Sequence, residues 1–113
     1  DVFRGGIVAY NPEVKRELLD VPDGPVVTEE AALAMARGVC ARLGADVGLA
    51  TTGVAGPDGL EGHSPGTVCL AAVWPQGEAS VTLKLPGARQ QIREFACISV
   101  LDLLRRRLMV DDA

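Results

Sequence analysis

The sequence lacks the features that mark a nucleic-acid-binding or membrane-spanning chain. Its 113 residues carry 11 Lys and Arg against 15 Asp and Glu, which gives a net charge of −4. The basic residues are scattered except for the run at 105–107, whereas a nucleic-acid binder usually gathers them on one face. No apolar run approaches the ~20 residues that span a bilayer, and no charged segment followed by an apolar one opens the chain. We therefore expect a soluble protein that binds neither nucleic acid nor a membrane.

The sequence also has little that could form a disulfide framework or a metal site. Cys40, Cys69 and Cys97 are odd in number and lack CxxC spacing, which argues against both. Each cysteine lies in an apolar stretch, so we expect buried free thiols of a reducing compartment, which favours the cytoplasm. The single histidine, His63, has no second ligand at helical spacing. We expect no metal and no cofactor.

The composition and the order of the expected elements indicate one layered domain over residues 1–113. Hydrophobic residues make up 48% and charged residues 23%, as in globular proteins, and neither a repeat nor a linker interrupts the chain. The alternation of patterns predicts a mixed sheet packed by helices, an α/β or α+β domain. Strands are expected at 2–10, 47–53, 66–74 and 78–85, and helices at 12–19, 29–43 and 88–109.

Helix-capping residues support these boundaries. Asn11 is a good N-cap for the first helix, and Pro12 suits its first position. Thr28 is expected to cap the second helix, and Gly44 is placed to end it. The glycine pair at 5–6 predicts a bulge or a close backbone approach within the first strand.

Tyr10 and Lys15 form the first candidate site. With Asn11 as N-cap, they occupy the two positions that touch in a hydrophobic staple, so we expect their side chains to lie side by side. The positive helix end and any burial both lower the pKa of a lysine, towards the roughly 7 to 8 that suits a general base. The alternative is that Lys15 extends into solvent and Tyr10 is a half-buried aromatic at the end of a strand.

The second candidate site is the glycine-rich loop TGVAGPDGLEGHSPGT after residue 51. Its glycines allow backbone amides to approach a ligand and to form an anion-binding nest. It lacks the GK[ST] ending of a P-loop, and its spacing is not GxGxxG. The alternative interpretation is a long loop without a ligand.

Arg89, in the first turn of the last helix, is the third candidate. An arginine at this end opposes the helix dipole unless an anion binds there, in which case the helix amides and the guanidinium act together. The alternative is an exposed surface arginine.

These segments, taken in order, resemble a known family. GGIVAYNPEVKRELLDV, VTEEAALAMARGVCARLGADVGLATTGVAGPDG, SPGTV and LPGARQQIREFA are similar to the C-terminal domain of the competence/damage-inducible CinA proteins, the nicotinamide-nucleotide amidase (PncC) family. The resemblance covers essentially the whole chain. Its combination of VAY-x4-K, TG[IV]AGP and PG-x-R is specific.

The resemblance implies a three-layer α/β/α fold and the hydrolysis of nicotinamide mononucleotide to nicotinic acid mononucleotide and ammonia, in pyridine-nucleotide salvage, without metal or cofactor. It implies a serine nucleophile in a motif like ESCTGG, assisted by Tyr10 and Lys15. The substrate contacts implied in the TGVAGP loop and at the start of the last helix are Thr52, Gly53, Ala55, Gly56 and Arg89.

The chain departs from the family pattern at its nucleophile. An ESCTGG segment is absent, Ser64, Ser80 and Ser99 stand in no similar context, and Ala88 replaces the usual acid of PGDR. We expect a single CinA C-terminal-like domain that lacks its N-terminal strand and helix, with the serine upstream of this chain. The alternative is a non-catalytic relative that binds a ligand or another protein. The half-exposed last strand leaves room for self-association into a homo-oligomer.

Overall fold

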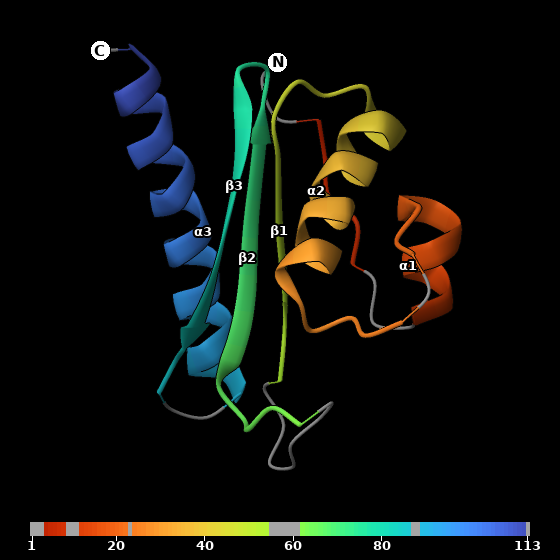
Figure 1. Ribbon diagram of the computed structural model, residues 1–113, viewed down its shortest axis with the longest axis vertical. Coiled ribbons are helices and arrows are strands. Elements are labelled where there is room, and N and C mark those ends of the chain that lie inside the picture. Colours follow the sequence, from red (N-terminus) through yellow and green to blue (C-terminus); the bar gives the residue numbers. More distant parts are fainter. Residues whose placement is uncertain (1–3, 9–11, 23, 55–61, 87–88, 113) are drawn as a thin grey trace.

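Helices cover both faces of one small sheet. The computed structural model describes residues 4–8, 12–22, 24–54, 62–86 and 89–112. Figure 1 shows helices on both sides of the sheet, so the predicted three-layer α/β/α fold is confirmed. The elements in chain order are α1 (Pro12–Leu19), α2 (Glu29–Leu43), β1 (Gly48–Gly53), β2 (Thr67–Trp74), β3 (Gly77–Lys84) and α3 (Arg89–Asp112).

The sheet has the order β1-β2-β3, and both pairs are antiparallel. In its register Ala71 lies opposite Ala50 and Ser80. Every residue of β2 is buried, as expected for a strand that has a neighbour on each edge and a helix on each face. The prediction of a strand at 66–74 is therefore confirmed.

The prediction of a mixed sheet with a strand at 2–10 differs from the structure. Within the described part of the chain the sheet is wholly antiparallel, and residues 4–8 are not hydrogen-bonded into it. Gly5 has a φ of 138°, a region that only glycine enters readily, and this interrupts the extended run. Arg4 Nε instead donates to the carbonyl of Leu43 at 3.0 Å. The rest of the predicted strand, 1–3 and 9–10, lies outside the described residues.

The caps of α2 form as the sequence predicts. Thr28 is extended, with φ −142° and ψ 157°, and its hydroxyl accepts a hydrogen bond from the Ala31 amide at 3.0 Å. Gly44 adopts the left-handed conformation with φ 64°, and its N–H donates to the carbonyl of Cys40. These contacts satisfy backbone groups that a helix end leaves without partners. They fix the two ends of α2.

Two apolar clusters hold the layers together. The larger one joins α1 and α2 to one face of the sheet and includes Leu19, Val27 and Ala36. The smaller one packs Ile92, Ala96 and Val100 of α3 against the other face. Phe95 of the same helix is 43% exposed, because the contact uses a narrow row of residues spaced by four.

Candidate functional site

A buried lysine on α1 meets a buried threonine on β1. Lys15 is only 8% exposed, and its Nζ donates to Oγ1 of Thr52 at 3.5 Å. Thr52 is 6% exposed and donates its hydroxyl proton to the carbonyl of Val26 at 2.8 Å. Since a hydroxyl has one proton and two lone pairs, it can donate to Val26 and accept from Lys15 at once. The contact joins three segments that are far apart in the sequence.

The end of α1 holds Lys15 in place from the C-terminal side. Asp20 adopts a left-handed conformation with φ 56°, which aspartate tolerates better than most residues. The turn lets the Val21 amide donate back to the carbonyl of Lys15 at 3.1 Å. Leu19 and Val21 are both 3% exposed and belong to the larger cluster. Burial of these two residues draws α1 onto α2, and the Lys15 side chain with it.

The sequence left two interpretations of Lys15 open: a general base, or a lysine that extends into solvent. The structure buries this side chain, which overturns the alternative. Burial of an amine is costly unless polar partners surround it, and Thr52 supplies one of them. Tyr10, expected beside Lys15, lies outside the described residues.

Gly53 closes β1 where two backbones approach closely. A Cβ at this position would lie 2.6 Å from the carbonyl oxygen of Thr67 and 3.0 Å from Cα of Val68. The pairing continues one residue further, since the Val54 amide donates to the Thr67 carbonyl at 2.9 Å. The packing of the sheet therefore requires a glycine at position 53, whether or not Gly53 also contacts a ligand.

The structure brings the end of β1 and the start of α3 to the same end of the sheet. Because β1 and β3 are both antiparallel to β2, they run in the same direction, and their carboxyl ends lie at the same end of the sheet. β3 ends at Lys84 and α3 begins at Arg89. The first turn of α3 therefore lies at the end of the sheet where β1 also ends, with Thr52 and Gly53 (Figure 1). Ala55 and Gly56, and the side chain of Arg89, lie outside the described part of the structure.

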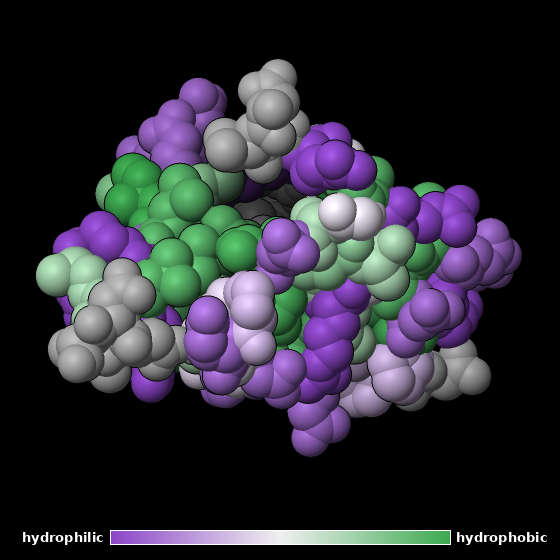
Figure 2. Space-filling view, turned by 90° about the horizontal axis from the view of Figure 1, so that it is seen from above, coloured by the Kyte–Doolittle hydropathy of each residue, from purple (hydrophilic) through white to green (hydrophobic). Residues whose placement is uncertain are grey.

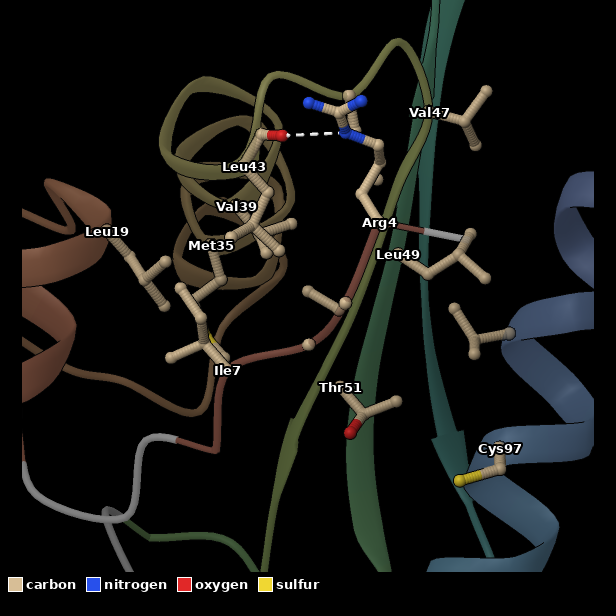
Figure 3. Close-up of a pocket in the computed structure, with 16 residues that line it drawn as sticks. Arg4, Ile7, Leu19, Met35, Val39, Leu43, Val47, Leu49, Thr51 and Cys97 are labelled. Carbon is tan, nitrogen blue, oxygen red and sulfur yellow. Dashed lines mark hydrogen bonds between the residues drawn. The ribbon is translucent and has the colours of Figure 1, made fainter. Parts of the chain in front are cut away.

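An open cavity among the described residues lies elsewhere. A cavity of about 500 Å³ opens between the segment at 4–7, α2, β1 and α3. Figure 3 shows Ile7, Met35 and Leu49 around it, with Thr51 and Cys97 near one end. Figure 2 shows a hollow bordered on one side by hydrophobic side chains. Lys15, Thr52 and Gly53 do not line this cavity, so its apolar walls and the predicted chemistry are separate features.

A second polar cluster joins the first turn of α2 to β3, and sequence reasoning missed it. The carboxylate of Glu29 accepts hydrogen bonds from the hydroxyls of Ser80 and Thr82, both at 2.7 Å. The Thr82 bond, and then the Ser80 bond, lowers the pKa of Glu29 below its ordinary 4.5. The alternation of β3 placed Ser80 and Thr82 on its polar side, and that side faces α2. A signal was present, but a single sequence does not say which helix covers a polar face.

The prediction that all three cysteines are buried free thiols holds only in part. Cys69 is buried and Cys40 half-buried, whereas Cys97 is exposed, so the prediction of buried thiols is wrong for Cys97. Burial, and then the nearby carboxylate of Asp46, raises the pKa of Cys40. Across the described ranges, no group of three or more potential metal-ligating side chains occurs, and His63 is half-buried.

A helix that crosses a bilayer must be both long and apolar. None of the helices in the part of the chain that the structure describes is both long and apolar enough to cross one.

Known proteins match this chain over nearly its whole length. The "CinA C-terminal domain" family matches residues 1–108. A "CinA-like protein" of Frankia casuarinae is 49% identical over 111 residues, which cover 94% of this chain and 26% of that protein. Another, of Desulfotalea psychrophila, is 42% identical over 96% of this chain and 28% of its own length. The chain thus spans about a quarter of the curated relatives it matches.

Solved structures agree in fold. The competence damage-inducible protein A of Klebsiella pneumoniae has a TM-score of 0.82 and 28% identity, covering 88% of this chain and 66% of that one. A competence/damage inducible protein of Agrobacterium tumefaciens has a TM-score of 0.78 and 29% identity, covering 87% and 64%. With the motifs, the layered fold and these matches, the chain belongs to the CinA C-terminal domain family.

Proposed function

We propose that this chain provides the lysine of an amidohydrolase site that converts nicotinamide mononucleotide to nicotinic acid mononucleotide and ammonia. The observation that carries the proposal is the burial of the Lys15 side chain, from α1, against Thr52 of β1. Most lysines stay in solvent, and a general-base lysine is one of the few uses that require desolvation. The membership of the CinA C-terminal domain family supports it.

The nucleophile in this proposal is a serine of an ESCTGG-type motif, which the 113 residues do not contain. The neutral amine of Lys15 accepts the serine proton while the serine oxygen bonds to the carboxamide carbon. The resulting ammonium returns the proton to the amide nitrogen as the C–N bond breaks, and ammonia leaves. Water then attacks the ester, again with Lys15 as base, which releases the carboxylate and restores the serine. Tyr10 orients this pair or relays the proton.

The ribose phosphate binds at the end of the sheet where β1 stops and α3 begins. The amides of a helix N-terminus favour a phosphate, and Arg89 is the first residue of α3. The proposed phosphate site also uses backbone amides of the TG[IV]AGP motif, those of Gly53, Ala55 and Gly56. Thr52 contributes through Lys15, because its own proton is directed to Val26.

Ammonia release tests the proposal. The chain is measured alone and joined to the ESCTGG-type segment of a CinA relative, with nicotinamide mononucleotide as substrate. We expect the joined protein to release ammonia, and Lys15→Ala to reduce the rate by about 100-fold or more. The matched control is Arg42→Ala, which removes an exposed cation in the last turn of α2, away from the proposed phosphate site, and we expect it to leave the rate unchanged. A folded joined protein whose rate Lys15→Ala leaves unchanged contradicts the proposal.

A second function, binding without hydrolysis, is favoured by one observation: Ala88 stands where the family motif has an acid. Such a domain would bind the nucleotide, or another protein, and release no ammonia. Calorimetric titration of nicotinamide mononucleotide, run beside the ammonia assay on the same joined protein, distinguishes the two: binding without turnover favours this second function.

A further inference from the structure

The outer face of α3 carries a row of residues that the sheet does not use. Ile98 is 64% exposed and Leu101 57% exposed, although Ile92, Ala96 and Val100 on the opposite side of the helix are buried. Figure 1 shows α3 as the outermost layer on its side of the sheet. Single exposed apolar residues are ordinary on a protein surface. Whether Ile98 and Leu101 indicate a contact surface therefore depends on the residues around them on the helix.

Ile98 and Leu101 lie at the centre of a seam with alternating spacings of three and four. The seam is defined here as Gln91, Glu94, Ile98, Leu101, Arg105 and Leu108. Spacings of this kind keep residues on one stripe of a helix and are those of a coiled-coil contact. All of the seam is exposed except Leu108, which is half-buried. At 1.5 Å per residue it runs for about 25 Å.

The seam is complementary to itself when reversed. If two copies of α3 pair antiparallel about a two-fold axis between Ile98 and Leu101, each Ile98 meets the Leu101 of the other copy. The same axis places Glu94 opposite Arg105, and Gln91 opposite Leu108. Opposite charges therefore flank an apolar centre on both sides. A parallel pair would instead place Glu94 against Glu94 and Arg105 against Arg105, which is unfavourable.

We propose that α3 is a self-association surface through which two copies of this chain form an antiparallel, two-fold symmetric helix pair. In such an isologous contact the same patch serves both copies. A single helix pair of this length is a small interface, of the size typical of weak and reversible complexes. Arg105 also pairs with Asp102 of its own helix at 2.7 Å, and its several N–H groups allow both contacts.

Sedimentation equilibrium across a wide range of protein concentrations tests the dimer on the full chain. We expect a monomer–dimer equilibrium in which Ile98→Glu raises the dissociation constant by about 10-fold or more, because a carboxylate then enters the apolar centre. Val8→Glu is the matched control, since Val8 is 77% exposed and lies far from α3 in the sequence, and we expect it to change the constant by less than about twofold.

Disulfide crosslinking tests the orientation. Glu94→Cys and Arg105→Cys are made separately in a Cys97→Ser background, which removes the exposed native thiol of this helix. An antiparallel pair crosslinks only when the two variants are mixed, because position 94 then faces position 105. The Cys97→Ser protein alone controls for the remaining native thiols.

Three results would overturn the proposal. They are a monomer at every concentration, a dimer that Ile98→Glu does not weaken, and crosslinks that form within each single-cysteine variant rather than between the two. Circular dichroism of Ile98→Glu shows whether the variant that loses the dimer is still folded. The double variant Glu94→Arg with Arg105→Glu exchanges the two charges, and we expect it to restore the association that either change alone weakens.

Discussion

The Nζ of Lys15 lies 3.5 Å from Oγ1 of Thr52, and the same hydroxyl donates to the Val26 carbonyl at 2.8 Å. The contact joins α1, β1 and the segment before α2, and both side chains are buried. Thr52 therefore fixes where the amine of Lys15 lies. In the proposed reaction this makes Thr52 a positioning residue, which acts through Lys15.

Replacing Thr52 separates this positioning role from the substrate contact that the family motif suggests. Thr52→Val removes the hydroxyl from both Lys15 and Val26, and we expect a loss of about 1 to 3 kcal/mol in the free energy of unfolding. If Thr52 positions Lys15, kcat falls and KM changes little; if it holds the nucleotide, KM rises instead. Thr52→Ser keeps the hydroxyl and should retain most of kcat. Steady-state ammonia release and urea unfolding measure the two effects.

Lys15→Met should separate stability from activity. Methionine has a similar length and no polar head, so the cost of burying an amine disappears while packing is largely kept. We expect the free energy of unfolding to stay within about 1 kcal/mol of the original or to rise, and ammonia release by the joined protein to fall by about 100-fold or more. A large loss of stability would mean that the amine is needed for the fold, and activity retained by this variant would remove Lys15 from the reaction.

The local parts of this fold could be predicted from the sequence, because local physics decides them. Thr28 and Gly44 end α2 as expected, since a side-chain cap and a left-handed glycine satisfy helix ends without help from other elements. The apolar run of β2 likewise predicts its burial on both faces. These features depend on a few neighbouring residues only.

The parts that failed depend on distant contacts. The glycine pair at 5–6 looked like a strand with a bulge, whereas Gly5 turns the chain and Arg4 contacts the end of α2. The Glu29 cluster needs the register of β3 relative to α2, which no spacing within either element gives. Helix capping predicted an unusual environment for Lys15, but the choice of Thr52 as its partner follows from how α1 packs against α2 beside the sheet.

Acidification should weaken the link between α2 and β3. The hydroxyl bonds from Thr82 and Ser80 lower the pKa of Glu29 in the folded state below its ordinary 4.5. The contribution of this carboxylate to stability is therefore full above that ordinary value and is lost as the pH falls through the lower folded value. Glu29→Gln should cost about 1 kcal/mol at neutral pH, and less as the pH falls. Urea unfolding between about pH 3 and pH 7 measures the difference.

Glu30→Gln is the matched control for this pH dependence. Glu30 stands in the same first turn of α2 and shares the favourable helix-dipole position, but its side chain is exposed. A pH profile for Glu30→Gln equal to that of Glu29→Gln would show that the dipole, and not the contact with β3, causes the effect.

Gly38→Ala should displace α1 and, with it, Lys15. Gly38 is buried in the middle of α2, and a Cβ there would overlap the backbone carbonyl of Leu19 at the end of α1. Alanine favours a helix over glycine by about 1 kcal/mol, but the overlap with backbone cannot be relieved by a side-chain rotation. We expect a net loss of about 1 to 3 kcal/mol in the free energy of unfolding, together with lower ammonia release in the joined protein. Gly6→Ala, where a Cβ meets nothing within 4 Å, should change stability by less than about 0.5 kcal/mol; equal losses in the two variants would show that contact between α1 and α2 at Gly38 does not hold Lys15 in place.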